Sequence, residues 1–179
     1  MDILLRELRI RNAVSTDSEQ LAAWWNDGAV MAHAGFPLGL GTDAEKVARQ
    51  LAAESDERGR TLIIEYGGRP IGEMNYRNLD RGTAEIGVKI CREAYRERGL
   101  GRILLSMLIR ELFSAGCGKI VLDTNLENRR AQHVYELLGF RKLRENKDSW
   151  RDQLGRPQSS VDYELRPEDF RDFSALREN

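Results

Sequence analysis

The heptapeptide Arg96-Glu97-Arg98-Gly99-Leu100-Gly101-Arg102 decides the fold, because it joins a strand-like run to a helix-like one. Residues 84–91 before it are mostly apolar, and residues 99–115 after it repeat apolar side chains at helical spacing. Two glycines at such a junction let the backbone approach a ligand closely. The first turn of a helix presents N–H groups without intrahelical partners, and its dipole favours negative charge. Three nearby arginines have the matching sign, so the stretch predicts a site for a phosphate-bearing cofactor.

The composition is that of an ordinary globular chain of 179 residues, 41% hydrophobic and 32% charged, with a net charge of −1. This charge provides no overall field to attract nucleic acid or an anionic membrane. No apolar run reaches the roughly 20 residues of a membrane helix, and the N-terminus lacks the pattern of a signal peptide. Cys91 and Cys117 are too few and too far apart for a disulfide framework or a metal-ligand pair. We therefore expect a reduced, cytoplasmic protein without a metal site.

The order of elements predicts one mixed α/β domain over residues 1–179, with a core at about 4–166 and a charged tail, 167–179, that frays. Turns are expected at 67–70 and 78–82, and a loop or broken helix at 29–41. The helix at 99–115 implies a right-handed crossover, so the strands before and after it should lie in parallel. Strands are expected at 4–14, 61–66, 71–77, 83–91, 119–124, 140–147 and 159–165, and helices at 15–25, 44–58, 99–115 and 128–138.

Two further features carry side chains suited to chemistry. In the segment 125–140, Asn128 and Tyr135 fall on one helical face, and Asn125 lies just before that helix. Glu85 is a carboxylate inside an otherwise apolar strand. Each feature also has a purely structural interpretation: a helix-start turn for the glycines, a core aromatic with a satisfied hydroxyl for Tyr135, and an exposed strand face for Glu85.

Taken together, the 96–101 loop and the 125–140 segment resemble the GNAT superfamily of acyl-CoA-dependent N-acyltransferases, and the resemblance covers roughly residues 4–165. Glu85 lies eleven residues before Arg96, the spacing of the general-base glutamate in histone-acetylating members. The early Trp24-Trp25-Asn26-Asp27 segment looks more like the bacterial branch that acts on ribosomal-protein N-termini, aminoglycosides or small amines. The resemblance implies a mixed, mostly antiparallel sheet of about six or seven strands with a splayed parallel pair at its centre, flanked by about four helices.

The resemblance also implies roles for individual residues. Tyr135 would protonate the leaving CoA thiolate, and Glu85 would remove the proton that blocks the acceptor amine. The pantetheine arm would pair with the backbone of Val88, Lys89 and Ile90, and Asn125 and Asn128 would make polar contacts to it. The diphosphate would lie on the loop formed by Arg96, Glu97, Arg98, Gly99, Leu100, Gly101 and Arg102.

The implied activity is transfer of an acetyl group from acetyl-CoA to a primary amine by direct attack in a ternary complex. Three alternatives stay open: another acyl-CoA donor, a non-catalytic acyl-CoA-binding regulatory domain, and a nucleotide-dependent transferase. The sequence identifies neither the acceptor nor the oligomeric state, although a homodimer is compatible with the resemblance. The candidates for the acceptor side, each with a structural alternative, are His33, Trp24, Trp25, Glu73 and Tyr76.

Overall fold

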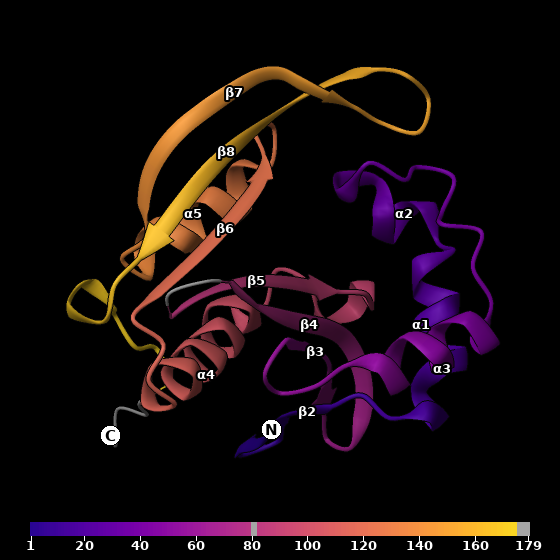
Figure 1. The fold of residues 1–179 in the computed structure, drawn as a ribbon, viewed down its shortest axis with the longest axis horizontal. Coiled ribbons are helices and arrows are strands. Elements are labelled where there is room, and N and C mark those ends of the chain that lie inside the picture. Colours follow the sequence, from indigo (N-terminus) through magenta and orange to yellow (C-terminus); the bar gives the residue numbers. More distant parts are fainter. Residues whose placement is uncertain (80–81, 175–179) are drawn as a thin grey trace.

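The computed structural model describes residues 1–79 and 82–174, in which eight strands form one sheet in the order β1-β2-β3-β4-β5-β6-β8-β7 (Figure 1). The strands are β1 (Asp2–Leu5), β2 (Leu8–Asn12), β3 (Gly59–Tyr66), β4 (Arg69–Leu79), β5 (Thr83–Ile90), β6 (Lys119–Asn125), β7 (Arg141–Arg151) and β8 (Pro157–Leu165). The α-helices are α1 (Ser18–Trp25), α2 (Gly28–Met31), α3 (Ala44–Ala53), α4 (Leu100–Ser114) and α5 (Arg129–Leu137). The pair β5–β6 is parallel and the other neighbours are antiparallel, which confirms the predicted mixed sheet.

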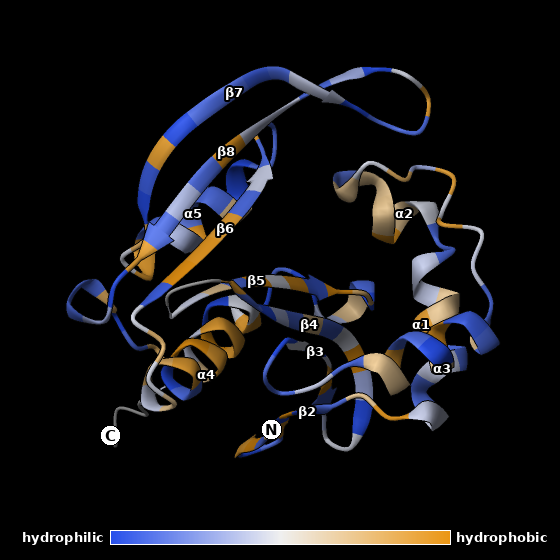
Figure 2. Ribbon diagram, viewed as in Figure 1, coloured by the Kyte–Doolittle hydropathy of each residue, from blue (hydrophilic) through white to orange (hydrophobic). Residues whose placement is uncertain are grey.

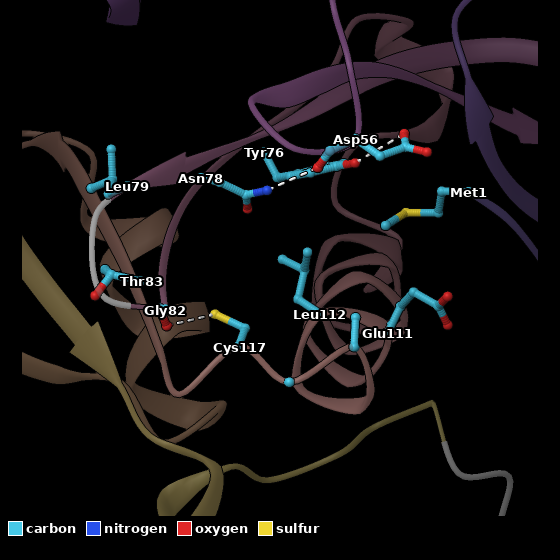
Figure 3. A pocket seen from close by; sticks show the side chains of 12 residues that line it. Met1, Asp56, Tyr76, Asn78, Leu79, Gly82, Thr83, Glu111, Leu112 and Cys117 are labelled. Carbon is cyan, nitrogen blue, oxygen red and sulfur yellow. Dashed lines mark hydrogen bonds between the residues drawn. The ribbon is translucent and has the colours of Figure 1, made fainter.

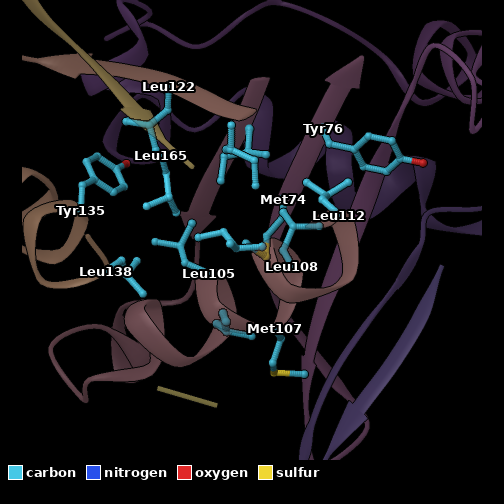
Figure 4. Close-up of a cluster of buried hydrophobic side chains, with 14 of the residues drawn as sticks. Met74, Tyr76, Leu105, Met107, Leu108, Leu112, Leu122, Tyr135, Leu138 and Leu165 are labelled. Carbon is cyan, nitrogen blue, oxygen red and sulfur yellow. The ribbon is translucent and has the colours of Figure 1, made fainter. Parts of the chain in front are cut away.

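Two apolar layers hold helices against opposite faces of the sheet. The larger layer joins β2–β6 and β8 to α4 and α5, and its buried side chains include Leu105, Leu108 and Tyr135 (Figure 4). The smaller layer joins α1–α3 to Ile63 of β3 and to Cys91. Helix α4 is the most apolar helix in Figure 2, as expected for one that buries a broad stripe. No helix in the described ranges is long and apolar enough to cross a bilayer.

The predicted first strand is the main error in the architecture. Residues 4–14 do not form one strand, because β1 and β2 are two antiparallel strands joined by a tight turn. Arg6 in that turn has a φ of 54°, a left-handed conformation usually taken by glycine or asparagine, so the sequence carries no ordinary turn signal. The sheet therefore has eight strands rather than six or seven.

Several boundaries also differ. Helix α3 ends at Ala53 instead of residue 58. The next residue, Glu54, accepts hydrogen bonds from the backbone and hydroxyl of Thr61 instead of continuing the helix. Strand β7 runs on to Arg151, so β7 and β8 form a longer hairpin than predicted. The short helix α2 and the following 3-10 turn η2 (Ala32–Ala34) confirm the broken helix expected between residues 29 and 41.

The described part of the C-terminal tail is docked, so the prediction that it frays is wrong for residues 167–174. Phe170 packs edge-on against Phe113 of α4, with ring centroids 5.8 Å apart. The backbone N–H of Phe173 donates to the Ser106 hydroxyl at 2.9 Å, and Ser174 is 2% exposed. Residues 80–81 of the predicted second turn and 175–179 of the predicted tail lie outside the described residues.

Candidate active site

The parallel pair β5–β6 separates along its length. The pairing covers three residues of each strand and ends where Glu85 lies opposite Val121. Beyond that point β5 continues to pair with β4 as far as Ile90, while β6 turns away to pair with β8 (Figure 1). Residues 86–90 of β5 therefore face β6 without a strand partner on that side. This confirms the splayed central pair and leaves the backbone of Val88, Lys89 and Ile90 along an open edge.

The glycine-containing loop follows β5 after a short 3-10 turn, η3 (Glu93–Tyr95), and leads into α4. Gly99 is the N-cap of α4 with a φ of 73°, and Glu97 also has a positive φ of 62°. Among the residues that the structure describes, no side chain caps this helix start, so its first N–H groups depend on solvent or a ligand. A Cβ added to Gly101 would meet no atom within 4 Å, so the space beside this glycine in the first turn is open.

The arginines of this loop have structural partners. Arg96 donates to the carbonyl oxygens of Ile90 at 2.9 Å and Cys91 at 3.2 Å, which fixes the loop to the end of β5. The guanidinium of Arg98 lies 5.9 Å from the ring centroid of Tyr66 and 5.7 Å from that of Tyr95.

Arg102 stacks over the Phe173 ring at 5.4 Å, and Glu97 forms an ion pair with Arg130 at the start of α5. The guanidinium groups of this loop already interact with protein groups. An anion at this turn would therefore be bound mainly by backbone amides.

Tyr135 points from α5 towards β6 (Figure 4). It is 8% exposed and packs edge-on against Phe140 and Tyr163, at 5.7 and 5.8 Å between centroids. No residue in the described part of the chain forms a hydrogen bond with its hydroxyl. Burial, with a smaller contribution from the Asp123 carboxylate, raises the pKa of Tyr135 to about 12. The hydroxyl therefore keeps its proton at neutral pH and has none of the partners expected of a purely structural buried tyrosine.

The two asparagines of the second motif are engaged with neighbouring residues. Asn128 caps α5 by accepting from the backbone N–H of Ala131 at 3.2 Å. Asn125 donates to Gln158 at 2.8 Å and accepts from the Glu127 backbone at 2.9 Å. Both side chains thus shape the turn between β6 and α5.

Glu85 lies on the face of the sheet opposite α4. Its side chain is 34% exposed and forms an ion pair with Arg77, its neighbour on β4. A cavity of about 750 Å³ opens over this face. It is bounded by the α1–α3 region and strands β3–β5, and the polar residues that line it are Gln50, Glu54, Arg58, Arg60, Thr61, Glu73, Asn75, Tyr76, Arg77, Glu85 and Lys89.

At the base of this cavity Glu73 is 2% exposed and held from two sides. The indole N–H of Trp25 donates to one carboxylate oxygen at 2.9 Å, and Lys89 donates to the other at 2.9 Å. Trp25 lines the cavity and Trp24 belongs to the core behind it, which answers the question left by their adjacency. Of the other acceptor-side candidates, Tyr76 borders the cavity, but its side chain packs in the apolar layer on the α4 face of the sheet. His33 is exposed and does not line the cavity.

The end of the β7–β8 hairpin reaches across to the segment after α2. Gln153 accepts from the Leu38 backbone at 2.9 Å and donates to the Gly39 carbonyl at 3.0 Å. Its own backbone N–H donates to the Gly35 carbonyl at 2.8 Å, and the Trp150 ring covers Gly35 so closely that a Cβ there would lie 2.4 Å from it. Sequence reasoning did not predict this contact, because it joins residues more than a hundred positions apart.

A second cavity, of about 550 Å³, lies at the opposite end of β4 and β5 (Figure 3). It is lined by Met1, Asp56 and Tyr76 on one side and by the end of α4 and Cys117 on the other. Apart from Tyr76, no side chain singled out in the sequence for catalysis or binding borders it. The open strand edge, the uncapped start of α4 and Tyr135 all lie elsewhere.

Comparisons with known proteins agree with this geometry. A family model described as "Acetyltransferase (GNAT) family" matches residues 30–140, more than half of the chain. An N-alpha-acetyltransferase 30 from Dictyostelium discoideum is 28% identical over 72 residues, which are 40% of this chain and 38% of that relative's length.

Solved structures show the same fold over nearly the whole chain. A spermidine N-acetyltransferase from Vibrio cholerae, in complex with CoA and spermine, has a TM-score of 0.79 at 20% identity over 91% of this chain and 97% of that one. A ribosomal L7/L12 alpha-N-protein acetyltransferase in complex with coenzyme A has a TM-score of 0.81 at 15% identity, with 93% and 98% covered. The family match and the separated parallel pair lead to one conclusion: this chain belongs to the GNAT family of acetyltransferases.

Proposed function

We propose that this protein transfers an acetyl group from acetyl-CoA to a primary amine, by direct attack of the amine on the thioester in a ternary complex. The observation that carries the proposal is a coincidence of three features at one place in the fold. These are the open edge of β5, the start of α4 at Gly99, and the hydroxyl of Tyr135, which has no hydrogen-bond partner in residues 1–79 and 82–174.

The donor fits this gap as an extended molecule. Its diphosphate would accept hydrogen bonds from the amides of residues 98–102, where the helix dipole favours negative charge. Its pantetheine arm would then lie along Val88, Lys89 and Ile90 like an additional strand, because peptide-like groups can pair with an open strand edge. In this arrangement Asn125 and Asn128 would lie on the other side of the pantetheine arm. The similar structures named above contain CoA, which supports this choice of cofactor.

The chemistry needs a proton acceptor and a proton donor on either side of the thioester. A primary amine with an ordinary pKa near 10.4 is mostly protonated at neutral pH, so a carboxylate such as Glu85 assists the attack. A backbone N–H near Val88 would stabilise the developing oxyanion. Tyr135 would then protonate the sulfur as the C–S bond breaks, and its high pKa keeps that proton available.

The amine acceptor would enter through the cavity over Glu85, from the side of α1–α3 and the β7–β8 hairpin. Its chemical range is an amine on a small molecule or at a peptide N-terminus. We also propose that residues 1–179 act as one domain in the cytoplasm, where the free thiols of Cys91 and Cys117 would stay reduced. A homodimer is compatible with this arrangement.

The test is a panel of amines with acetyl-CoA, monitored by release of free thiol. The panel contains spermidine, a short peptide with a free N-terminus and an aminoglycoside, and we expect at least one to turn over. Longer acyl-CoA donors, used in parallel, separate acetyl transfer from transfer of other acyl groups. CoA binding without turnover on any amine would favour a regulatory acyl-CoA-binding domain. Preference for ATP or NAD over CoA in a binding titration would reject the proposal.

A further inference from the structure

The floor of the cavity over Glu85 is formed by side chains that share one face of β4 and β5. Residues that lie opposite each other on paired strands project from the same face. The pairing places Glu73 opposite Lys89, Asn75 opposite Gly87, and Arg77 opposite Glu85. The first and last of these pairs are ion pairs. Asn75 therefore places a neutral amide at the middle of the floor, with opposite charges on either side.

The amide of Asn75 extends over Gly87 towards the open edge of β5. A Cβ on Gly87 would lie 3.0 Å from Nδ2 and 3.2 Å from Oδ1 of Asn75, so the missing side chain of this glycine leaves the room that the amide occupies. Gly87 lies two residues beyond Glu85, the last residue of β5 that pairs with β6. The amide is therefore next to the stretch of β5 along which the pantetheine arm is proposed to lie.

The hydrogen-bonding groups of this amide are unused. An asparagine side chain offers a carbonyl oxygen as acceptor and an NH2 group as donor. Across residues 1–79 and 82–174, neither group of Asn75 forms a hydrogen bond with another protein group, although the residue is only partly exposed. Its neighbour on β3, Thr61, donates its hydroxyl to Glu54 at 2.7 Å instead. The Asn75 amide is thus suited to a ligand group that offers both a donor and an acceptor.

The charges of the cavity lining do not suit an acceptor with several ammonium groups. The lining contains three carboxylates and four cationic residues, which are Glu54, Glu73, Glu85, Arg58, Arg60, Arg77 and Lys89. Each of the three carboxylates already accepts hydrogen bonds from neighbouring residues. Among the described residues of this lining, a second ammonium group would therefore find no carboxylate without a partner, and it would lie near positive charges that repel it.

The wall of the cavity formed by the α1–α3 region is mostly apolar. Trp25, Met31, Leu40 and Ala53 line it. An uncharged side chain next to the reacting amine would bury apolar surface against this wall, which is favourable. The floor and the wall together therefore match an acceptor with one ammonium group, one amide group and an uncharged side chain.

We infer that Asn75 is a specificity-determining residue that binds the amide group next to the reacting amine, so that the acceptor is an α-amino amide such as the first residue of a peptide. The inference rests on the proposed acetyl transfer and narrows its acceptor. A peptide group presents one C=O and one N–H, and the Asn75 amide would donate to the first and accept from the second. A polyamine has only methylene groups next to its amine, so it would leave the Asn75 amide without these partners.

The test compares wild type, N75A and N78A on two matched acceptors. These are alanyl-alanine amide and its ester analogue, in which oxygen replaces the N–H of the first peptide group. Asn78 is the control, because it lies on the same strand but outside this cavity and donates to the backbone carbonyls of Asp56 and Glu57. We expect N75A to lose about 30-fold in kcat/KM on the peptide, the effect of two ordinary hydrogen bonds.

The ester analogue gives a readout that a merely structural role of Asn75 would not produce. The preference for peptide over ester should be about tenfold greater in wild type than in N75A, because only wild type can accept the peptide N–H. N78A should keep the wild-type preference, and CoA affinity should be unchanged in both variants. An equal preference in wild type and N75A would overturn the inference.

Spermidine and an aminoglycoside, assayed with the same proteins, separate this inference from the proposed function. We expect wild type to acetylate both more slowly than the peptide. Faster turnover of either one would overturn the inference and leave acetyl transfer intact. Absence of turnover by wild-type protein on every amine would remove both the inference and the proposed function.

Discussion

Replacing Tyr135 with phenylalanine tests the site most directly, because we expect a large fall in kcat and almost no change in stability. The hydroxyl forms no hydrogen bond within the described ranges, so its removal breaks no native contact. We expect the free energy of unfolding to change by less than about 0.5 kcal/mol. A general acid contributes about 10²–10⁴-fold, so kcat should fall at least roughly 100-fold, equivalent to about 2.7 kcal/mol of barrier.

Tyr163 provides the matched control for this variant. It lies against Tyr135, is 1% exposed, and donates its hydroxyl to Glu136 at 3.0 Å. Y163F should therefore lose about 1.5–3 kcal/mol of stability, the net value of a hydrogen bond to a charged group, while kcat changes less than threefold. Urea unfolding measures the stability of each variant, thiol release measures kcat, and CoA titration checks that both variants still bind the donor. A normal kcat in Y135F, or a kcat loss that follows a loss of stability, would refute the role of Tyr135 as the acid.

The same variant has a signature at alkaline pH. The pKa of Tyr135 is about 12 in the folded protein, against about 10 in an unfolded chain. The folded state therefore holds this proton more tightly, and its stabilising effect is complete below pH 10 and is lost as the pH rises towards 12. Y135F should lose less stability than wild type over that interval. An identical decline in the two proteins would show that the hydroxyl is not buried as described.

Three other changes have defined outcomes. Gly99→Ala places a side chain at a φ of 73° with no atom closer than 3.9 Å, so urea unfolding should show a conformational loss of about 1 kcal/mol, and CoA should bind more weakly. Glu73→Gln removes the buried partner of Lys89 and should lower the free energy of unfolding by about 1–3 kcal/mol; no change would mean that the pair is dispensable. Burial raises the pKa of the Cys91 thiol to about 12, so mass spectrometry after iodoacetamide treatment at pH 8 should find Cys117 alkylated first, and equal labelling would contradict the buried placement.

The central part of the fold could be predicted because its signals are local. Helix α4 and strands β3–β6 combine apolar periodicity with glycines at their ends, and their types follow from those patterns. The turn at Arg6 carries no such signal, so β1 and β2 were merged into one strand. The docking of the tail depends on Phe170 and Phe173, two apolar residues in a charged segment whose partners on α4 are about sixty residues away.

The candidate site divides in the same way. The glycine loop and the helix carrying Tyr135 are sequence motifs, so their positions could be predicted from spacing. The partners of each charged side chain could not, because they come from other strands. Arg96 looked like a phosphate ligand, yet its guanidinium holds the end of β5.

The region proposed to admit the acceptor is the hardest to predict from sequence, because its contacts join segments far apart in the chain. Gln153 forms hydrogen bonds with three backbone groups between residues 35 and 39, close in sequence to Leu40, which lines the cavity over Glu85. That contact requires both a β7–β8 hairpin long enough to reach and glycines at 35 and 39, where a Cβ would collide with Trp150 or with the Asn26 backbone. The length of the β7–β8 hairpin and the conformation of residues 35–39 therefore have to change together if this contact is to be kept. A side chain at Gly35 or Gly39 would collide with its neighbours, so we expect a single substitution at either glycine to destabilise this contact.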